Sequence, residues 1–359
     1  MNGPMRICLI ASSRFPVGEP FMGGLEAHTH ALASRLIRRG HQVSVFAAAG
    51  SDPELGATLV PAAVFSSSPT ARADVGSPPE VWMQEHHAYL DLMLGLTRGE
   101  HGSFDVIHNN SLHHLPVAMS PLLETPMVTV LHTPPVPWLE SAVGFAARRS
   151  RFIAVSHGVS RAWRHVVSSV TVHNGVDVAR WFLGSGGGPA LWTGRIVPEK
   201  APHEALLAAR AAGLSLDVAG PVHDEDYFAA EVRPLLGPSA RYLGHLHGEV
   251  LRAAVRNASV VVVTPHWEEP FGLVGAEALA CGTPVAAYDR GALPEILDQH
   301  TGVLAPAGDV AALAEAMGRA VALDRAAARR RAVSHFSLDR MVEGYEAVYA
   351  EMTREDEAA

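Results

Sequence analysis

Glu269-Pro-Phe-Gly-Leu-Val-Gly-Ala-Glu277, preceded by the apolar run Ser259-Val-Val-Val-Val-Thr264, is the most informative stretch of the sequence. The apolar run predicts a buried parallel strand, and residues 273–281 predict a helix that stops at a glycine. Strand, loop and helix in this order present backbone N–H groups at a helix N-terminus, which suits an anionic or hydroxyl-rich ligand. A carboxylate accepts hydrogen bonds from two vicinal hydroxyls at once. Glu269 in the loop and Glu277 in the early helix therefore suit a sugar and a ribose.

Predicted strands and helices alternate along the rest of the chain. Residues 6–10 predict a strand, residues 24–39 a helix and residues 42–46 a second strand, which together form a βαβ unit and imply a parallel sheet. Further strands are predicted at 104–107, 127–131, 152–155, 170–172, 190–193, 215–219, 241–243, 260–263 and 285–287. Further helices are predicted at 80–96, 203–212, 224–236, 248–257, 272–280, 309–323 and 338–352, and a long loop at 61–79. The pattern favours two doubly wound α/β domains.

Length and composition agree with two domains. The chain has 359 residues, and domains average roughly 150 residues. The net charge of −9 argues against nonspecific nucleic-acid binding, which needs a basic surface, and disfavours docking on an anionic membrane. Cys8 and Cys281 fall in different halves of the chain, so no disulfide is expected and a cytoplasmic location fits. Apolar runs are too short for the roughly 20 residues of a membrane span.

Four other stretches accompany the Glu269–Glu277 segment in order along the chain. They are Gly23-Gly24-Leu25-Glu26, Phe104-Asp105-Val106-Ile107-His108, His173-Asn174-Gly175-Val176-Asp177 and Gly194-Arg195-Ile196-Val197-Pro198-Glu199-Lys200. With Glu-x7-Glu they resemble the retaining glycosyltransferases of family GT4. The resemblance implies the α/β GT-B fold, with two Rossmann-like doubly wound domains facing each other across a central cleft. It implies an acceptor domain over 1–175, a nucleotide-sugar donor domain over 176–336, and a C-terminal helix with an acidic tail over 337–359 that crosses back to the first domain.

Arg195 and Lys200 flank a turn that follows a predicted strand. Two preorganised cations stabilise the charge that grows on a departing nucleoside diphosphate, with Arg able to form two parallel bonds and Lys acting as a point charge. Taken alone, such a pair reads as an ordinary exposed ion pair; the resemblance assigns both residues to the pyrophosphate. The family usually has glycine after this lysine, whereas here Ala201 follows, which puts the geometry of the turn in question.

The resemblance also assigns the donor-binding groups. Glu269 is similar to the glutamate that contacts the transferred sugar, and the spacing favours it over its neighbour Glu268. Glu277 is similar to the glutamate that holds the ribose; without that context it reads as a solvated helix residue. The remaining expected donor-binding residues are Gly23, Gly24, Asn174, Gly194, Phe271, Gly272 and Leu273.

Histidines follow two of the predicted strands. His132 follows residues 127–131 and resembles the family histidine that touches the donor sugar near the reaction centre, so it is expected to be catalytic together with Arg195, Lys200 and Glu269. His108, His113 and His114 gather after another strand. They suit an acceptor site or a solvated loop better than a metal site, because no cysteine or paired acid lies at ligand spacing.

The resemblance as a whole implies a retaining hexosyltransferase. It would move a sugar from a nucleotide-diphosphate donor, UDP by preference, to a hydroxyl of a small-molecule, glycan or natural-product acceptor, without a metal or other cofactor. Three alternatives stay open: a nucleotide-sugar epimerase of the same fold, a sugar phosphorylase, and a non-catalytic nucleotide-sugar-binding protein. The acceptor, the base of the donor and the oligomeric state are not readable from the sequence.

Overall fold

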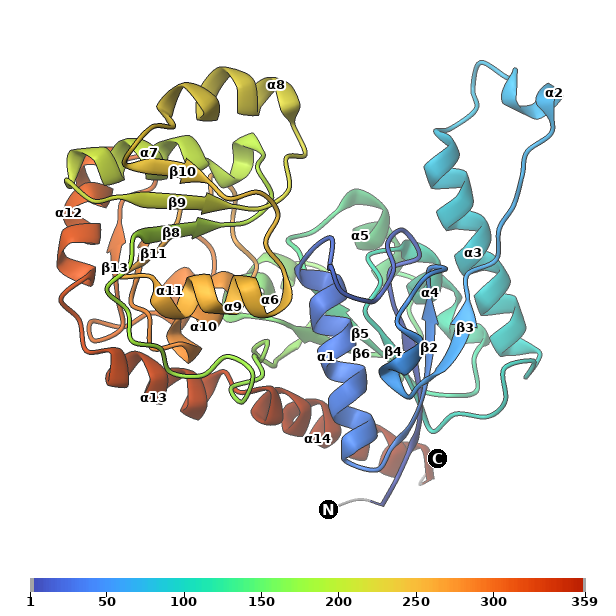
Figure 1. Cartoon of the computed structure of the whole chain (residues 1–359). Coiled ribbons are helices and arrows are strands. Elements are labelled where there is room, and N and C mark those ends of the chain that lie inside the picture. Colours follow the sequence, from blue (N-terminus) through green and yellow to red (C-terminus); the bar gives the residue numbers. More distant parts are fainter. Residues whose placement is uncertain (1–2, 358–359) are drawn as a thin grey trace. The chain divides into compact units, whose positions relative to one another are not determined.

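The computed structural model describes residues 3–357 and divides them into two compact α/β units (Figure 1). Unit 1 comprises residues 3–155, 159–172 and 342–357, and unit 2 comprises residues 156–158 and 173–341. Each unit is built on a single sheet in which every strand pair is parallel. The two parallel sheets confirm the predicted α/β class with two Rossmann-like domains.

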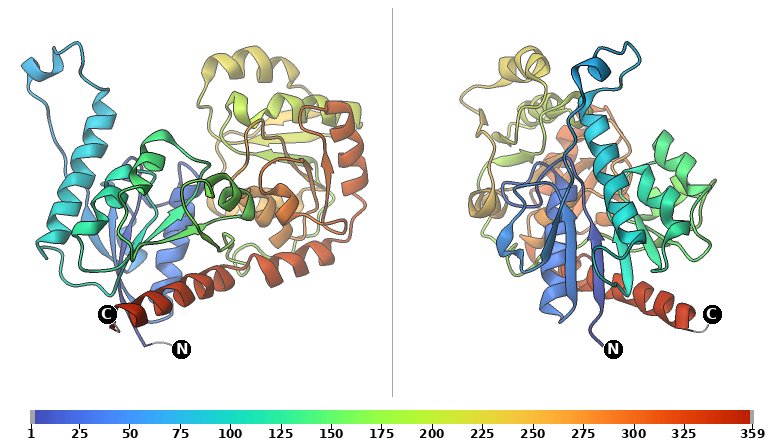
Figure 2. Two further views of the ribbon diagram at one scale, coloured as in Figure 1. Left: turned by 180° about the vertical axis from the view of Figure 1, so that it is seen from behind. Right: turned by 90° about the vertical axis from the view of Figure 1, so that its right-hand side faces the viewer.

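The sheet of unit 1 has seven strands in the order β3-β2-β1-β4-β5-β6-β7. The strands are β1 (Arg6–Ile10), β2 (Gln42–Ala47), β3 (Thr58–Pro61), β4 (Val106–Asn109), β5 (Met127–Leu131), β6 (Arg151–Ala154) and β7 (Val170–Thr171). The α-helices are α1 (Gly24–Arg38), α2 (Pro69–Arg72), α3 (Glu80–Thr97), α4 (His114–Met119), α5 (Pro137–Val143), most of α6 (His157–Trp163) and most of α14 (Leu338–Glu357), with short 3₁₀ turns η1 (Pro53–Leu55) and η2 (Ser120–Leu122). Figure 2 shows that the segment with α2 at its tip reaches away from this sheet.

Burial explains why the central strands of unit 1 form. All five residues of β5 and all four of β4 are buried, as expected for strands covered on both faces by helices. The two are hydrogen-bonded neighbours, with Ile107 opposite Met127 and Asn109 opposite Thr129. The carboxyl ends of β4 and β5 therefore meet at one edge of the sheet.

The sheet of unit 2 has six strands in the order β10-β9-β8-β11-β12-β13. The strands are β8 (Ala190–Thr193), β9 (Leu216–Ala219), β10 (Ala240–Tyr242), β11 (Val261–Val263), β12 (Val285–Tyr288) and β13 (Gly302–Ala305). The helices are η3 (Pro198–Lys200), α7 (Pro202–Ala211), α8 (Glu225–Tyr227), η4 (Phe228–Val232), η5 (Arg233–Leu235), α9 (Gly248–Asn257), α10 (Leu273–Ala280), α11 (Leu293–Ile296), α12 (Val310–Ala320) and α13 (Arg325–His335).

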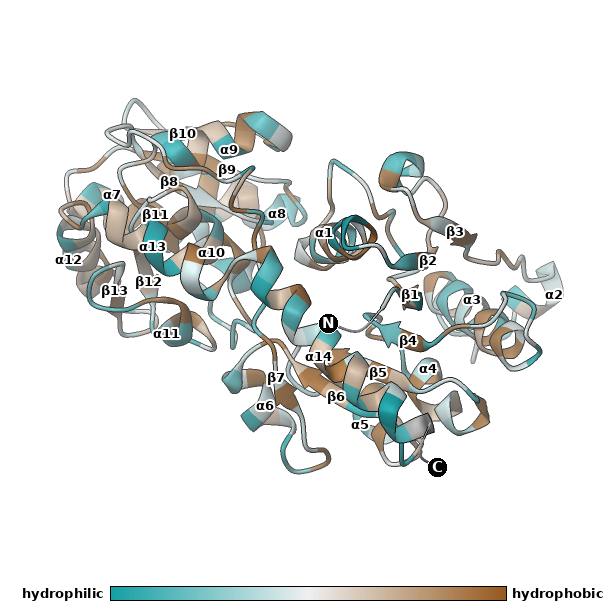
Figure 3. Cartoon of the chain, turned by 90° about the horizontal axis from the view of Figure 1, so that it is seen from below, coloured by the Kyte–Doolittle hydropathy of each residue, from teal (hydrophilic) through white to brown (hydrophobic). Residues whose placement is uncertain are grey.

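The core of unit 2 lies between its sheet and the helices that cover it. Trp192, Val218 and Val262 from three strands pack with Leu313 and Met317 of α12. Figure 3 shows the hydrophobic colouring of these strands. Since β8 and β11 are neighbours, with Leu191 opposite Val261, the loops that follow them lie at the same edge of the sheet. In parallel sheets this carboxyl edge is where ligands bind.

The predicted elements differ from the structure in several places. Strands β3 and β13 lie in stretches where none was predicted, and α2 lies inside the predicted loop 61–79. The helix predicted over 224–236 is an irregular series of α8, the π-helical turn η4 and the 3₁₀ turn η5. Pro234 accounts for the last change, because proline lacks the N–H that a regular helix needs. Cys8 and Cys281 are both buried free thiols.

No helix within the described residues is long and apolar enough to cross a membrane.

Candidate functional site

The loop after β8 carries Arg195 and depends on two glycines. Gly220, which follows β9, has a φ of +146°, and a Cβ there would lie 1.7 Å from the carbonyl oxygen of Gly194. Only glycine permits this approach. Arg195 is half-buried, and no residue in the part of the chain that the structure describes pairs with its guanidinium. A cation held at the carboxyl edge of the sheet without a protein partner is available to an anionic ligand.

Lys200 and Glu269 form an ion pair at the same edge. Lys200 Nζ lies 2.5 Å from Glu269 Oε2, and the indole N–H of Trp267 donates to the same oxygen at 3.1 Å. Lys200 also lies over the Trp267 ring, 5.1 Å from its centroid. Only 11% of the Glu269 side chain is exposed, so the pair is largely shielded from water. Sequence analysis did not single out Trp267, although it lies two residues before Glu269.

The position of Lys200 is fixed through its backbone. The Trp192 indole N–H donates to Thr264 Oγ1 at 3.0 Å, and this hydroxyl lies 2.8 Å from the carbonyl oxygen of Lys200, to which it donates. Ala201, where the family usually has glycine, has a φ of 45° and a ψ of 51° and is fully buried. The turn thus keeps the left-handed conformation that glycine favours, which strains an alanine by roughly 1–2 kcal/mol.

The segment after β11 separates two neighbouring carboxylates. Glu268 is exposed and accepts a hydrogen bond from the Gly291 N–H at 3.0 Å, whereas Glu269 faces Lys200. Gly272 then takes a φ of +89°, and Leu273 begins α10. A Cβ on Gly272 would lie 2.9 Å from Leu293, so the turn is closed to larger residues. The arrangement presents Glu269 rather than Glu268 beside the cation.

Glu277 lies in the middle of α10, whereas the sequence analysis expected it in the early helix. Its side chain is half-buried, and no side chain among residues 3–357 forms a hydrogen bond or ion pair with it. Desolvation raises the pKa of this carboxyl to about 8, and the nearby Arg252 only partly opposes the shift. A shielded carboxyl without a partner is ready to accept hydrogen bonds from a ligand.

Phe271 and Asn174 lie deeper in unit 2. Phe271 is buried, and its ring lies 6.0 Å from that of His173 and 5.9 Å from that of Phe336. Asn174 is buried, and its side-chain oxygen has no hydrogen-bond partner in the part of the chain that the structure describes. A Cβ on Gly175 would lie 2.7 Å from the backbone of Leu338, so the Asn-Gly pair packs tightly against the start of α14. The structure thus gives Asn174–Gly175 a packing role and one unused acceptor.

In unit 1, Gly23 and Gly24 stand at the start of α1. Gly23 is the N-cap residue in extended conformation, and its carbonyl oxygen accepts from the Ala27 N–H at 3.3 Å. No side chain caps this end of the helix. A helix N-terminus next to a residue without a side chain is the kind of end that accommodates a phosphate.

His132 lies at the end of β5 in a buried histidine-rich group. Its Nε2 lies 2.9 Å from Asn110 Oδ1, and its ring is 4.9 Å from that of His28. Burial, aided by His28 and His108, holds the pKa of His132 well below its usual value, so the ring is neutral. His108 was expected after the strand with His113 and His114, but it lies inside β4 with no exposed surface and contacts Asn110 instead. The strand ends two residues later than predicted, and this places His108 in the core.

The third histidine beside His113 and His114 is His86 of α3, which sequence spacing could not reveal. The ligand atoms of the three rings all lie within 4.8 Å of one another, a separation that a metal ion could bridge. His113 and His114 are stacked at 4.3 Å, and burial lowers the pKa of both. The Leu115 N–H donates to His113 Nδ1 at 3.3 Å, so this nitrogen has no lone pair left for a metal.

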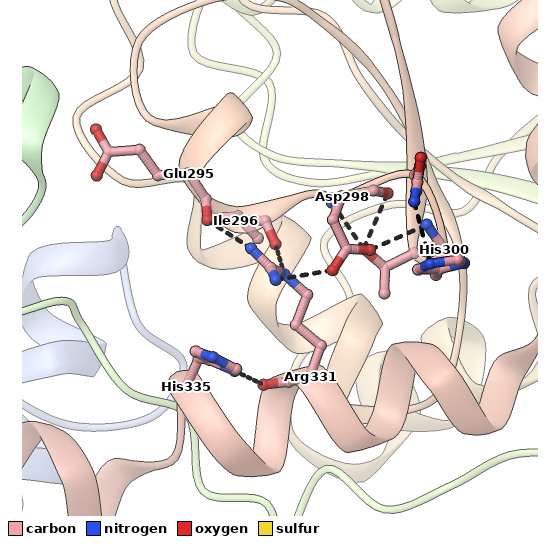
Figure 4. Close-up of polar contacts among 8 residues, drawn as sticks. Glu295, Ile296, Asp298, His300, Arg331 and His335 are labelled. Atoms are coloured by element: carbon pink, nitrogen blue, oxygen red, sulfur yellow. Dashed lines mark hydrogen bonds and ion pairs between the residues drawn. The ribbon is translucent and has the colours of Figure 1, made fainter.

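A second group combines His157, His173 and Glu295 in unit 2. Glu295 accepts hydrogen bonds from the N–H groups of His157 at 2.8 Å and Gly158 at 2.7 Å, and lies 3.0 Å from His173 Nε2. These partners outweigh desolvation and lower its pKa. Figure 4 shows Arg331 bonding to backbone oxygens at Glu295 and Ile296 and to Asp298, while the Glu295 carboxylate points away from it. Both oxygens of Glu295 are thus engaged in holding structure.

The structure therefore gathers most predicted donor residues at one edge of unit 2. The segment after β8 carries Gly194, Arg195 and Lys200, and the segment after β11, which continues into α10, carries Glu269, Phe271, Gly272, Leu273 and Glu277; the Lys200–Glu269 ion pair joins the two segments. Gly23, Gly24 and His132 belong to unit 1.

Comparisons with known proteins agree with these motifs. Residues 22–180 match the family model described as Glycosyltransferase Family 4, and residues 188–334 match the model described as Glycosyl transferases group 1. The chain is similar to the glycogen synthase of Mycobacterium tuberculosis, at 30% identity over 91% of this chain and 88% of that protein. It is also similar to the phosphatidyl-myo-inositol mannosyltransferase of Mycobacterium leprae, at 30% identity over 87% of this chain and 86% of that protein.

Among solved structures, the chain is similar to Anabaena HepE in complex with UDP and glucose. The TM-score is 0.75 at 18% identity, covering 97% of this chain and 100% of that one. At this identity the likeness shows the fold alone, which is the two-domain GT-B fold of glycosyltransferases.

Proposed function

This chain belongs to glycosyltransferase family 4, and we propose that it transfers a hexosyl group from a UDP-sugar to a hydroxyl of a small-molecule, glycan or natural-product acceptor with retention of configuration. The observation that carries the proposal is that the Lys200–Glu269 ion pair joins the segments that follow the neighbouring strands β8 and β11, while Arg195 and Glu277 on the same two segments have no side-chain hydrogen bond or ion pair among residues 3–357. The proposal of UDP rests on HepE, which was captured with UDP and glucose. Buried free thiols fit a reaction in the cytoplasm.

Each group at this edge has a distinct part in the proposal. Arg195 and Lys200 bind the diphosphate. Its oxygens replace part of the ion pair that Lys200 forms with Glu269 in the absence of ligand. Glu269 accepts hydrogen bonds from hydroxyls of the transferred sugar, and Glu277 accepts them from the ribose. The N-terminus of α10 at Gly272 adds backbone N–H groups and the positive end of the helix dipole.

The proposed chemistry is a front-face displacement. The acceptor oxygen forms a bond to the anomeric carbon on the face from which the diphosphate leaves, while the bond from that carbon to the phosphate oxygen breaks. The departing phosphate oxygen takes the acceptor proton. Charge grows on the diphosphate as the sugar gains oxocarbenium character, and Arg195 and Lys200 stabilise that charge. No protein nucleophile takes part, and the protein cations stand where other enzymes use a metal.

The test is calorimetric titration with UDP-, GDP-, TDP- and ADP-sugars, in buffer containing EDTA. We expect one nucleotide sugar to bind in a saturable way and Glu269→Gln to weaken that binding. Glu268→Gln is the matched control, because it removes the neighbouring exposed carboxylate and leaves the ion pair intact. Binding of none of the four, or equal effects of the two variants, would refute the proposed donor site.

Retention is tested separately by the anomeric configuration of the product, read from proton NMR coupling constants early in the reaction. An α-linked donor should give an α-linked product. An initially β-linked product would overturn the front-face mechanism while leaving the donor site standing.

A further inference from the structure

A single amide in unit 1 joins two histidines. Asn110 Oδ1 lies 2.9 Å from His108 Nε2 and 2.9 Å from His132 Nε2. On its other side, Asn110 Nδ2 lies 3.4 Å from Thr29 Oγ1. The one hydroxyl hydrogen of Thr29 is donated to the Leu25 carbonyl oxygen at 2.8 Å, so toward Asn110 this oxygen can only accept. The amide is therefore oriented with its nitrogen toward Thr29 and its oxygen toward the two imidazoles.

An amide oxygen carries no hydrogen, so both imidazoles must donate to it. A neutral imidazole has one N–H, and for His108 and His132 this N–H is then at Nε2. The hydrogen bond of His108 to Tyr349 is consistent with this tautomer. Tyr349 Oη lies 2.5 Å from His108 Nδ1, where its hydroxyl donates to the bare nitrogen. Orientation, tautomer and hydroxyl direction are thus consistent from Leu25 to Tyr349.

Both rings are neutral, because burial lowers the pKa of His108 to about 4 and that of His132 well below its usual value. His28, edge-on to His132, is more deeply buried, and its two nitrogens have no partner among the described residues. Among the described residues, the titratable groups that lower the pKa of His132 are the imidazoles of His28 and His108, and burial lowers the pKa of both as well.

We infer that Asn110 holds His132 in the Nε2–H tautomer and thereby leaves Nδ1 as a hydrogen-bond acceptor for a hydroxyl of the substrate. His132 is half-buried, and none of the residues that the structure describes bonds to its Nδ1. The histidine accordingly orients a substrate hydroxyl and does not supply a proton to the leaving group. Only the identity of the hydroxyl rests on the proposed function; the tautomer rests on the hydrogen bonds alone.

Tyr349 is a positioning residue in this scheme. It comes from α14, near the C-terminus, yet its hydroxyl fixes the tautomer of His108, which shares the acceptor of His132. Tyr345, one turn earlier on the same helix, is also buried, but its hydroxyl has no partner in residues 3–357. The two tyrosines therefore form a matched pair for experiment.

The experiment is long-range ¹H–¹⁵N correlation NMR of the histidine-labelled protein, which distinguishes protonated from bare ring nitrogens. His132 is assigned by the signals lost in His132→Gln. We expect Nε2 of His132 to be protonated and Nδ1 bare, unchanged between about pH 5 and 8. An Nδ1–H tautomer, or a ring that titrates in this range, would overturn the inference.

Three variants test which residues fix the tautomers of His108 and His132. Asn110→Leu should leave His132 in a mixture of tautomers. Tyr349→Phe should shift His108 Nδ1 while His132 keeps its Nε2–H, and Tyr345→Phe should change neither tautomer. Should Asn110→Leu fail to fold, the two tyrosine variants still decide, because identical spectra for both would disprove the network.

The substrate arm uses UDP-glucose as the probe on the wild-type protein. Binding should shift the His132 Nδ1 signal, as expected when it accepts a hydrogen bond, and leave Nε2 protonated. A sugar that binds by calorimetry without moving this signal would refute the contact with substrate. Absence of any binding would speak against the proposed donor site and not against the tautomer.

Discussion

The carboxyl edge of the sheet in unit 2 and the histidine network of unit 1 differ in the groups that they present to a ligand: ionisable side chains in unit 2 and neutral imidazoles in unit 1. In unit 2, Arg195 and Glu277 are ionisable groups without a side-chain hydrogen bond or ion pair among the described residues, and Lys200 and Glu269 pair with each other. In unit 1, the rings of His108 and His132 are neutral, and every bond around Asn110 has a defined direction. Unit 2 offers the charges of Arg195 and of the Lys200–Glu269 pair, and unit 1 offers a single lone pair of fixed orientation. Losing charge should thus have the larger effect on rate.

The largest expected effect is that of removing a cation. Arg195→Ala should lower kcat by roughly 10²- to 10³-fold, the scale seen when one preorganised group that stabilises developing charge is lost. Its unfolding temperature should not change, because Arg195 has no ion pair or hydrogen bond to lose within residues 3–357. Lys200→Ala should lower kcat similarly but also lower the unfolding temperature, because Glu269 is then left shielded without its cation.

Steady-state kinetics and thermal unfolding of the two variants check this contrast. Arg241→Ala is the control, since Arg241 is an exposed arginine of β10 in unit 2 that pairs with Asp217 of the neighbouring strand β9. It should leave kcat unchanged. Full turnover in Arg195→Ala and Lys200→Ala would contradict the assignment of both cations.

The next effect is a pH dependence of donor binding that belongs to Glu277. Its pKa of about 8 means that the carboxyl is mostly protonated at neutral pH when no ligand is bound. Ribose hydroxyls donate to the ionised form, so binding favours loss of the proton and affinity rises as pH rises toward 8. The rise is at most about tenfold per pH unit. Calorimetric dissociation constants at several pH values measure it, and Glu277→Gln should remove the slope.

The pH dependence of the free energy of unfolding, measured without donor, is the control. Its sign is opposite to that of the pH dependence of donor affinity. A carboxyl whose pKa is raised by folding binds its proton more tightly in the folded state, so the free energy of unfolding falls as pH rises between the ordinary value of 4.5 and about 8. Glu277→Gln should lose this decline. Wild type and variant with parallel stability curves over that window would show that Glu277 is solvated and ordinary.

The sequence predicted the charged region better than the neutral one, for a physical reason. Arg195, Lys200, Glu269 and Glu277 lie in short motifs next to strands, so local spacing is enough to place them at a sheet edge. Even there, the partner Trp267 and the support from Thr264 were not foreseen, since both depend on how loops after β8 and β11 meet.

The neutral region could not be read from spacing. Tyr349 and His108 are 241 residues apart in the sequence, and His86 lies on a different helix from His114. His108 was misplaced because its strand was ended two residues early, and nothing local marks a histidine as buried. Networks of neutral groups form only when distant elements pack, so their members carry no motif.

A smaller effect separates the two tyrosines of α14. Tyr349→Phe should lower the free energy of unfolding by about 1 kcal/mol, the net value of one hydrogen bond, with a further loss from the unsatisfied His108 Nδ1. Tyr345→Phe removes a buried hydroxyl that has no partner among the described residues and should be neutral or slightly stabilising. Urea unfolding of both variants measures the difference. Equal losses would mean that ring packing, not the hydroxyl of Tyr349, accounts for the stability.

The smallest expected effect is that of removing metal ions: EDTA should leave kcat unchanged. Arg195, Lys200 and the start of α10 provide the positive charge around the diphosphate, so the proposed chemistry asks nothing of a divalent ion. Turnover measured before and after dialysis against EDTA checks this. Loss of activity that added Zn²⁺ restores in wild type but not in His86→Ala would instead place a functional metal among His86, His113 and His114. His87→Ala is the matched control on the same helix, because its ring stacks on Phe65 and lies outside the cluster. That result would move part of the chemistry from charge in unit 2 to imidazoles in unit 1, and the contrast between the two regions would have to be redrawn.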